Sequence, residues 1–514
     1  MQNPNLVLFK PHAIVIGSGF GGLAAAVRLG AKGYRVTVLE KLDAPGGRAY
    51  VHRRNGHVFD AGPTIITAPF LLEELWELCG KKLADHVEMR YLKDLFYRIR
   101  FDDGTWFDYT GDPEAMRKEV ARFSPEDLPG YENFFKEAEV CYRLGYEGMA
   151  SKAFDSIGDF VEVIPDFLRM GAWKSIYSLV AKHIKNPKLR QVFSFHPLLI
   201  GGNPFSVTCA YSLINILERR HGVHWAMGGT GSLINGLVDL IRGQGSQVLM
   251  NSEVKQITVE QGLATGVLLA NGDKLEADIV VSNGDTAWTY KNLVPAEFRK
   301  TWTDRKIERT KSSMGVFVWY FGTNKRFDDV PQHMILLGPR YEGLLTDIFK
   351  KHVLADDFSL YLHRPSAHDP AMAPQGCDTF YALSPVPNLA SGVDWAQRAE
   401  PYRKLIAKYL NDTVLPGFEA HVTESLVTTP LDFQNRLLSY RGAAFGPEPI
   451  LIQSAWFRPH NRSEDVKNLF MVGASTHPGA GVPGVIGSAK ALESVLPDAK
   501  SFAPRPVAVA KAEP

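Results

Sequence analysis

Residues 13–41 read AIVIGSGFGGLAAAVRLGAKGYRVTVLEK, and this stretch decides the fold. The apolar run Ala13 to Ile16 predicts a strand, and the alanine- and leucine-rich run after the glycines predicts a helix that stops at Gly33. A second apolar run, Tyr34 to Leu39, predicts another strand. The stretch therefore predicts a βαβ unit with a tight glycine turn between its first strand and its helix.

Three glycines in this turn have the spacing of a dinucleotide-binding loop. Gly17 permits the tight turn, Gly19 lets backbone approach a pyrophosphate, and Gly22 lets the helix pack closely on the strand. The N–H groups at the start of the helix then face the phosphates. Glu40, at the end of the second strand, can accept hydrogen bonds from ribose hydroxyls and would repel a 2′-phosphate. We predict dinucleotide binding; the alternative is a tight turn without a ligand.

The glycine motif alone does not separate NAD from FAD. A second glycine pair followed by a cation, Gly46-Gly47-Arg48, comes soon after Glu40. Arg48 can clamp a phosphate or the edge of a flavin, or it can be a solvated arginine on a surface turn. Together with the opening motif, this pair resembles the flavin-binding signature of the amine oxidase and carotenoid desaturase superfamily.

Further stretches resemble one family more specifically, in order from about residue 13 to 495. They are FDAGPT (59–64), FSFHPLLIGGNPF (193–205), GGTG (228–231), GPR (338–340), DFSLYLH (357–363), SPVP (384–387), QSAWFRPHNR (453–462) and GASTHPGAGVPGVIG (473–487). In these stretches the chain resembles the bacterial phytoene desaturases. The resemblance implies an FAD enzyme that introduces double bonds into a long polyisoprenoid, typically 15-cis-phytoene, in several steps towards neurosporene or lycopene.

The resemblance also implies which residues contact the cofactor. Contacts to the pyrophosphate region would come from Gly17, Gly19, Gly22, Gly46, Gly47 and Arg48. Contacts to adenosine would come from Glu40, at the ribose, and from the main chain of Val254, which is also a buried strand valine in a plainer interpretation. The segment that closes over the flavin would include Gly473, Val482, Pro483 and Val485. Helix N–H groups beyond that proline can support negative charge on a reduced flavin.

Desaturation removes a hydride and a proton from neighbouring carbons, and the flavin N5 is the natural hydride acceptor. The resemblance implies Asp159 as the acid/base, and apolar surroundings would raise its pKa. The alternative is that Asp159 caps a helix that starts at Phe160. Gly158 stands where the family often has a basic residue, which puts a cationic partner there in doubt. His196 and His477 are either structural histidines or catalysts.

These motifs predict an α/β protein with a discontinuous, Rossmann-like FAD-binding domain. An inserted substrate domain would contain a second mixed sheet and a helical, membrane-associated region. The expected segments are 12–110, 223–290 and 466–498 for the FAD-binding domain, 111–222 for the helical region, 291–465 for the substrate domain, and 499–514 for a disordered tail rich in Ala and Pro.

Composition and residue spacing exclude several kinds of partner and site. The 514 residues carry 57 basic and 56 acidic side chains, so a net charge of +1 gives no field that would attract nucleic acid. The four cysteines lack metal-ligand spacing, and we expect no metal site. The long uncharged run 191–217 is interrupted by Pro and Gly, so we expect no transmembrane helix. The first twelve residues lack a signal-peptide pattern, which favours the cytoplasmic side.

A membrane contact must then be local. Between Phe160 and Ile184 apolar residues recur at helical spacing among Arg and Lys side chains, the pattern of a helix pair lying in a lipid interface. A packed helical subdomain shows the same pattern, but a membrane-derived substrate favours monotopic attachment at the cytoplasmic face of the cell membrane. Pro165 and Gly171 would break or bend the helix. The expected partners are a hydrophobic C40 polyene, the membrane lipid surface, and oxygen or a quinone as electron acceptor.

Two other functions stay open at this stage. The chain could be a related enzyme that acts on a later or hydroxylated carotenoid or on a C30 chain, or that serves as a saturase or isomerase. A non-enzymatic isoprenoid-binding protein, like the Rab escort proteins and GDP-dissociation inhibitors, would share the fold without redox chemistry. No Ser/His/Asp set indicates a hydrolase.

Overall fold

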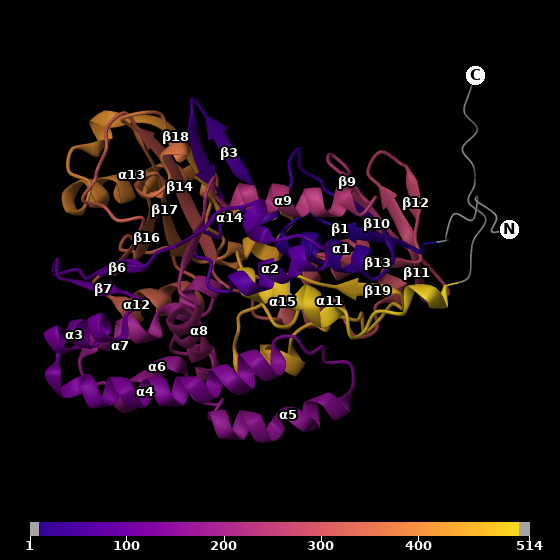
Figure 1. Cartoon of the computed structure of the whole chain (residues 1–514), viewed down its shortest axis with the longest axis horizontal. Coiled ribbons are helices and arrows are strands. Elements are labelled where there is room, and N and C mark those ends of the chain that lie inside the picture. Colours follow the sequence, from indigo (N-terminus) through magenta and orange to yellow (C-terminus); the bar gives the residue numbers. More distant parts are fainter. Residues whose placement is uncertain (1–9, 503–514) are drawn as a thin grey trace.

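The computed structural model describes residues 10–502 of the chain (Figure 1). Within these residues a five-stranded parallel sheet has the order β19-β13-β1-β2-β9. Its strands come from three separate stretches of chain: β1 (His12–Ile16) with β2 (Arg35–Leu39), β9 (Gln247–Leu249) with β13 (Ile279–Ser282), and β19 (Leu469–Met471). The predicted discontinuous, Rossmann-like sheet is confirmed.

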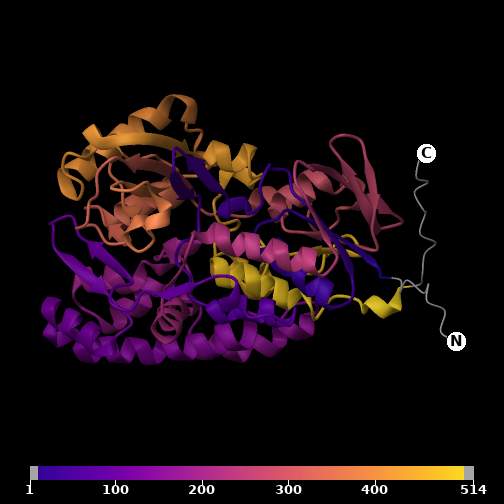
Figure 2. The same cartoon turned by 45° about the horizontal axis from the view of Figure 1, so that its top comes forward.

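Helices and a small sheet cover the two faces of this parallel sheet. Helix α1 (Phe20–Ala31) lies between α9 (Thr230–Gly243) and α15 (Val482–Leu492), which is why nearly all of its residues are buried (Figures 1 and 2). Helix α2 (Pro69–Glu77) completes that layer. The other face packs on an antiparallel sheet of β10 (Val254–Glu260), β11 (Leu263–Leu269) and β12 (Lys274–Glu276). A two-sided cover explains the continuously apolar strands.

A second, mixed sheet lies largely in the segment that we predicted to be the substrate domain, and we call it the substrate sheet. Within the described chain it has seven strands in the order β18-β14-β17-β16-β15-β6-β7, with only the β15–β6 pair parallel. The strands are β6 (Tyr97–Arg100), β7 (Trp106–Tyr109), β14 (Gly315–Thr323), β15 (His333–Leu336), β16 (Leu360–His363), β17 (Asp378–Val386) and β18 (Val422–Thr428).

The placement of β6 and β7 corrects one predicted boundary. We expected residues 12–110 to belong wholly to the FAD-binding domain, but these two strands extend the substrate sheet. Strand β6 pairs in parallel with β15, which satisfies the backbone groups of an edge that would otherwise be open. The two strands are far apart in the sequence, so no pattern within residues 97–109 predicts their pairing.

Strand β14 connects the substrate sheet to the cavity described below. Its alternate residues Phe317, Trp319 and Phe321 pack against α13 (Trp395–Thr413) on one face. Val316, Val318 and Tyr320 point to the other face and line the cavity. Because side chains alternate along a strand, one strand contributes both to the core and to the cavity wall.

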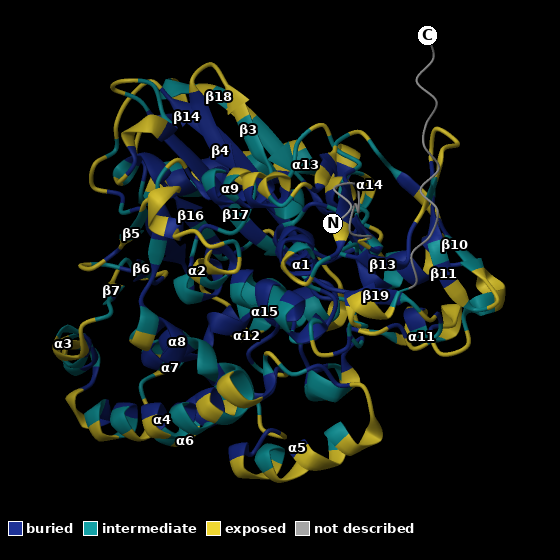
Figure 3. Ribbon diagram, turned by 45° about the vertical axis from the view of Figure 1, so that its right-hand side comes forward, coloured by how far each residue is buried: buried dark blue, intermediate teal, exposed yellow. Residues whose placement is uncertain are grey.

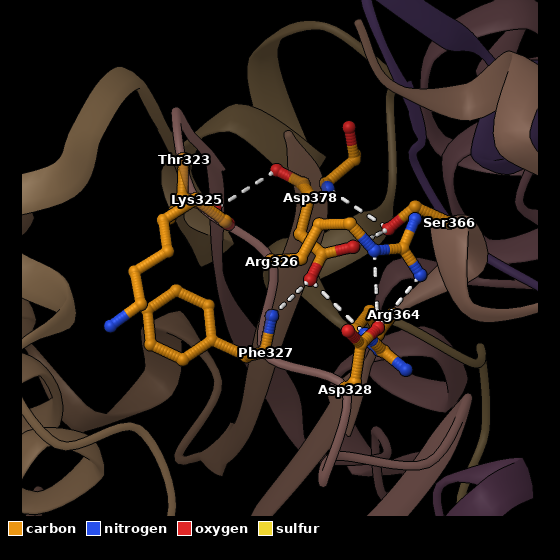
Figure 4. Close-up of polar contacts among 9 residues, drawn as sticks. Thr323, Lys325, Arg326, Phe327, Asp328, Arg364, Ser366 and Asp378 are labelled. Carbon is orange, nitrogen blue, oxygen red and sulfur yellow. Dashed lines mark hydrogen bonds and ion pairs between the residues drawn. The ribbon is translucent and has the colours of Figure 1, made fainter. Parts of the chain in front are cut away.

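A buried ion pair anchors the far end of this sheet (Figure 4). The Asp378 carboxylate lies 3.1 Å from Arg364 Nη1 and accepts hydrogen bonds from Ser366 Oγ at 2.6 Å and from the Phe327 backbone N–H at 2.7 Å. The Arg364 and Asp378 side chains are 5% and 0% exposed. The ion pair therefore links strand β17 to the segment that follows β16, and the Phe327 hydrogen bond attaches the loop after β14 to the same carboxylate.

The stretch expected to be helical forms a layer below both sheets in Figure 1. Its helices are α3 (Pro113–Phe123), α4 (Leu128–Cys141), α5 (Ile157–Met170), α6 (Ile176–His183), α7 (Pro187–Ser194) and α8 (Leu213–His221). The expected break occurs at Gly171, which takes a left-handed conformation with φ +65°. Pro165, in contrast, stays inside α5. No helix within residues 10–502 is long and apolar enough to cross a bilayer.

Further short strands and α-helices connect these elements. They are the hairpin β3 (Val51–Arg54) and β4 (His57–Asp60), the pair β5 (Met89–Tyr91) and β8 (His224–Ala226), and the helices α10 (Thr286–Trp288), α11 (Asp304–Arg309), α12 (Tyr341–Thr346) and α14 (Pro430–Asn435). At the C-terminal side, Ala499–Ser501 forms a 3-10 turn and the Phe502 ring packs edge-on against Tyr34. The disorder expected from residue 499 is therefore wrong for 499–502, and 503–514 lies outside the described residues.

Candidate active site

One cavity of about 530 Å³ joins the glycine turn after β1 to the inner face of the substrate sheet. One end is lined by Gly17, Gly19, Glu40 and the Gly46-Gly47-Arg48 turn. The other end is lined mainly by apolar side chains from β14, α8 and the 3-10 turn His196–Ile200. A polar cradle and an apolar pocket are thus parts of a single space.

The glycine turn has the predicted geometry. Gly17 has φ +90°, a conformation that L side chains rarely adopt. A Cβ on Gly22 would lie 2.1 Å from the Gly17 carbonyl oxygen, so only glycine lets α1 approach β1 this closely. Gly19 is the N-cap of α1 and makes no side-chain cap. The first N–H groups of α1 are therefore available to an anion.

Glu40 is buried, with 6% of its surface exposed, at the wall of the cradle. Its Oε2 accepts hydrogen bonds from Ser18 N–H at 2.8 Å and Ser18 Oγ at 2.6 Å, and its Oε1 accepts one from Leu42 N–H at 2.9 Å. These bonds stabilise the buried carboxylate and hold it at the end of β2, as the spacing predicted.

The second glycine pair lies beside the first. Gly46 forms an isolated bridge with Gly19, and Gly46 and Gly47 have φ +123° and +56°. Arg48 Nη2 donates to Ser439 Oγ at 2.9 Å, while its buried Nε has no partner among the described residues. Burial lowers the pKa of Arg48, and the nearby Asp285 carboxylate opposes that shift. The interpretation of Arg48 as a solvated surface residue is therefore wrong.

Asn283 and Asp285 contact the cradle, and sequence reasoning missed both. The Asn283 side chain lies against Gly17, Gly21 and Gly473, so it holds the turns together. Asp285 accepts hydrogen bonds from Trp288 N–H at 3.0 Å and Ser475 Oγ at 3.1 Å, and burial raises its pKa. Their position directly after strand β13 was a usable signal, because the carboxyl ends of parallel strands form the ligand crevice.

The closing segment brings the start of α15 to the cavity. Gly481, with φ +89°, precedes Val482 and Pro483, and all three line the cavity together with Val485. Gly473 lies one layer behind, where a Cβ would come within 2.7 Å of Asn283 Oδ1. Arg458, fully buried, donates to the Ala474 and Thr476 carbonyls at 2.6 and 3.2 Å and pins this segment from outside.

The comparisons with known proteins agree with this geometry. Residues 20–491 match the family model described as flavin containing amine oxidoreductase. A phytoene desaturase (neurosporene-forming) of Cereibacter sphaeroides is 51% identical over 95% of both chains, and a phytoene desaturase (lycopene-forming) of a Paracoccus species is 46% identical over 94% of this chain and 97% of its own. The chain belongs to the flavin-containing amine oxidoreductases, in the phytoene desaturase family.

Solved structures support the fold of this family. Putrescine oxidase bound to putrescine has a TM-score of 0.62 at 15% identity, covering 95% of this chain and 99% of that one. Cyclohexylamine oxidase from Brevibacterium oxydans has a TM-score of 0.60 at 16% identity, with the same coverage of both chains. At these identities the likeness concerns the fold alone.

The residues of the cradle fit a flavin dinucleotide. The starts of α1 and α15 reach the cavity, and neither has a side-chain cap. Arg48, whose Nε has no partner among the described residues, also lines the cavity. Val254, at the start of β10, also lines the cradle and is 7% exposed, as expected of a residue that offers only main chain. Such a donor-rich cradle suits a pyrophosphate and an anionic reduced flavin.

The structure places Asp159 in a capping box rather than at the cavity. Helix α5 begins at Ile157 with Ser156 as its N-cap, three residues before the start at Phe160 that we considered. The Asp159 carboxylate accepts hydrogen bonds from the backbone N–H groups of Asp155 and Ser156, at 3.0 and 2.8 Å. These bonds lower its pKa, so the raised pKa expected from apolar neighbours is wrong.

The two histidines have structural partners. His477 Nε2 donates to the Met149 carbonyl at 2.9 Å, and burial lowers its pKa to about 4, so its ring stays neutral. His196 is fully buried and bonds to Tyr97 and Glu218. Within residues 10–502 no group of three or more His, Cys, Asp or Glu is placed to hold a metal ion.

Proposed function

We propose that this chain is an FAD-dependent carotene desaturase that converts phytoene, in the 15-cis form, to neurosporene or lycopene by repeated removal of a hydride and a proton. The observation that carries the proposal is the single cavity that joins a dinucleotide cradle to an apolar pocket. The relatives that are 51% and 46% identical are named for desaturation of phytoene, and their named products are neurosporene and lycopene.

In this proposal the cradle residues hold FAD in three groups. Gly17, Gly19, Gly46, Gly47 and Arg48 hold the pyrophosphate region, Glu40 and Val254 hold the adenosine, and Val482, Pro483 and Val485 cover the flavin. Gly22 and Gly473 lie behind this lining, where they let α1 and the closing segment pack closely. The bound flavin supplies the hydride acceptor. The partial positive charge at the start of α15 would stabilise the negative charge that hydride acceptance creates.

The apolar half of the cavity suits a hydrocarbon. Leu198 and Leu199 from the 3-10 turn, Leu213 and Leu217 from α8, and Val318 from β14 line it. The hydroxyl groups present there largely satisfy one another: Thr64 Oγ1 lies 2.7 Å from Tyr381 OH and 3.0 Å from Tyr361 OH. A pocket with few free polar groups favours a ligand that has none, because an unpaired polar group would oppose desolvation.

Helix α5 offers a route from lipid to this pocket. Ile157, Val161, Ile164 and Leu168 recur at helical spacing on one face and are 67, 58, 37 and 62% exposed. The same helix lines the cavity through Phe167 and Met170. Figure 3 shows α5 at the lower edge of the molecule with much of its surface exposed.

Three further apolar side chains extend this face. Trp173 follows α5 and is 63% exposed, and Ile452 and Phe457, from the segment that packs beside Phe160, are 67 and 47% exposed. We call the set of Ile157, Val161, Ile164, Leu168, Trp173, Ile452 and Phe457 the apolar face. Large exposed apolar surfaces mark interaction sites, and Lys152 and Arg169, which form ion pairs with Glu162 and Asp166, flank this one.

We infer that the apolar face docks the enzyme peripherally on a lipid surface, so that phytoene enters beside α5. Attachment at the cytoplasmic face of the cell membrane belongs to this proposal. So does the reoxidation of the flavin by oxygen or a quinone.

One anaerobic experiment tests the proposal. Purified, FAD-loaded protein is mixed with phytoene in liposomes, and visible spectra are recorded over time, with empty liposomes as the control. Flavin bleaching together with new fine-structured polyene bands supports desaturation, and the band positions give the conjugation length. If the flavin stays oxidised with phytoene but bleaches with a later or C30 carotenoid, the fold assignment stands and the substrate is wrong.

A further inference from the structure

A fully buried polar network reaches the apolar half of the cavity. It joins Tyr97 on β6, His196 at the start of the 3-10 turn, and Glu218 on α8, each with none of its side chain exposed to solvent. Tyr97 OH lies 2.5 Å from Glu218 Oε2, and His196 Nε2 lies 3.1 Å from that same oxygen and 3.0 Å from Tyr97 OH. The three residues come from distant parts of the chain and belong to three different elements.

The hydrogen bonds leave one carboxylate oxygen available. Burial raises the pKa of Tyr97 well above its usual range, so its hydroxyl stays protonated and donates to Oε2. His196 donates through Nε2 to the same oxygen. Glu218 Oε1 has no hydrogen-bond partner among the described residues. An unsatisfied buried carboxylate oxygen costs folding free energy. An unpaired oxygen of this kind in a residue that lines an apolar cavity therefore indicates a functional role.

The other carboxylates of the cavity are engaged elsewhere. Glu40 and Glu253 lie at the cradle, where Ser18 and Lys41 bind them. Asp285 contacts Ser475 and lies near Arg48. Glu218 alone, of the carboxylates that line the described cavity, stands among apolar residues of the pocket proposed for the polyene, next to Leu217 on α8.

We propose that Glu218 accepts the proton that the substrate loses, and that Tyr97 and His196 position its carboxylate. This assignment rests on the proposed desaturase function. Bound FAD would accept the hydride, with both electrons of its C–H bond, from one carbon and would supply the two-electron oxidant. The proton of the neighbouring carbon passes to Glu218 Oε1, and the electron pair of that second C–H bond becomes the new C=C bond.

The geometry suits this division of labour. The proton and the hydride leave neighbouring carbons in one concerted step in this proposal, so losing the base also slows flavin bleaching, and an apolar pocket holds no bulk water to compete as a base. Two hydrogen bonds to Oε2 fix the orientation of the carboxylate and leave Oε1 without a hydrogen-bond partner among the described residues. Asp159, tied into its capping box, offers no such oxygen at the cavity.

The test compares glutamine variants by anaerobic single-turnover flavin bleaching with phytoene in liposomes. E218Q is expected to slow bleaching by about 100-fold or more, the usual effect of losing a general base, while its flavin absorbance stays at the wild-type level. The matched control is E448Q, because Glu448 is also a buried glutamate, 6% exposed and bonded to Ser206 Oγ, but lies outside the cavity lining. D159N serves as a second control.

Both controls are expected to bleach at near the wild-type rate. Should E218Q bleach as fast as E448Q while the wild-type enzyme desaturates phytoene, the assignment of Glu218 is overturned and the desaturase function stands. E218A gives an independent measurement, because formate added to the space left by the side chain should restore bleaching. Flavin-loaded E218A that stays slow at all formate concentrations would equally overturn the assignment.

Tyr97 has its own measurement as a positioning residue. Y97F should slow bleaching and raise the isotope effect for phytoene deuterated at the proton-losing carbon, because a misplaced base makes proton transfer more rate-limiting. An isotope effect equal to that of the wild-type enzyme would assign Tyr97 a purely structural role.

Discussion

Replacing two residues of the apolar face by serine should release the enzyme from lipid without unfolding it. Ile157 and Leu168 are 67 and 62% exposed, so most of each side chain makes no contact within the protein. Transfer of a whole Ile or Leu side chain from water to an apolar medium is worth about 2 kcal/mol. At these exposures I157S/L168S should lose about 2.5 kcal/mol of binding, or about 60-fold in partitioning.

The assay is sedimentation with neutral phosphatidylcholine vesicles, which suits a chain whose net charge is +1. The matched control is L263S/L405S, since Leu263 on β11 and Leu405 on α13 are 37 and 38% exposed and lie outside the apolar face. This control should partition like the wild-type protein, and I157S/L168S should keep the wild-type melting temperature. Partitioning of I157S/L168S within threefold of the control would refute the docking argument.

Three further predictions concern the cradle and the packing around it. G22A places a Cβ 2.1 Å from the Gly17 carbonyl oxygen, a clash that costs about 1–3 kcal/mol, so the variant should purify with ~10-fold less flavin by absorbance. D378A leaves the buried Arg364 without its nearest counter-charge and should lower the free energy of unfolding by about 3–5 kcal/mol in urea titrations. Burial raises the pKa of Asp60 from 3.8 to about 6, so the folded state binds more protons than the unfolded chain between these values. Stability should therefore fall by about 3 kcal/mol as the pH rises from about 4 to about 6, and D60N should abolish this slope.

Prediction from sequence worked best at positions where the local backbone conformation requires one residue type. The βαβ opening depends on a left-handed Gly17 and on a close helix–strand approach at Gly22, and both requirements are local and specific to glycine. The break at Gly171 follows the same logic. Such positions are readable because few other residues can occupy them.

Predictions of environment were weaker because they depend on distant neighbours. The apolar residues around Asp159 in sequence predicted a raised pKa, yet α5 presents that residue to backbone N–H groups at the surface end of the helix. Pro165 was expected to break or bend a helix that nevertheless continues past it. Composition near a residue does not state which side of the helix meets the core.

The sequence by itself determined the nucleotide cradle, the family and the continuously apolar strands, because glycine geometry and hydrophobic period are short-range properties. Only the tertiary structure decided which side chains face the cavity. Tyr97, His196 and Glu218 meet there from β6, a 3-10 turn and α8, and β6 joins the substrate sheet through a pairing with β15. Contacts between residues so far apart are set by how sheets and helices pack, and packing depends on the whole chain rather than on any one stretch of it.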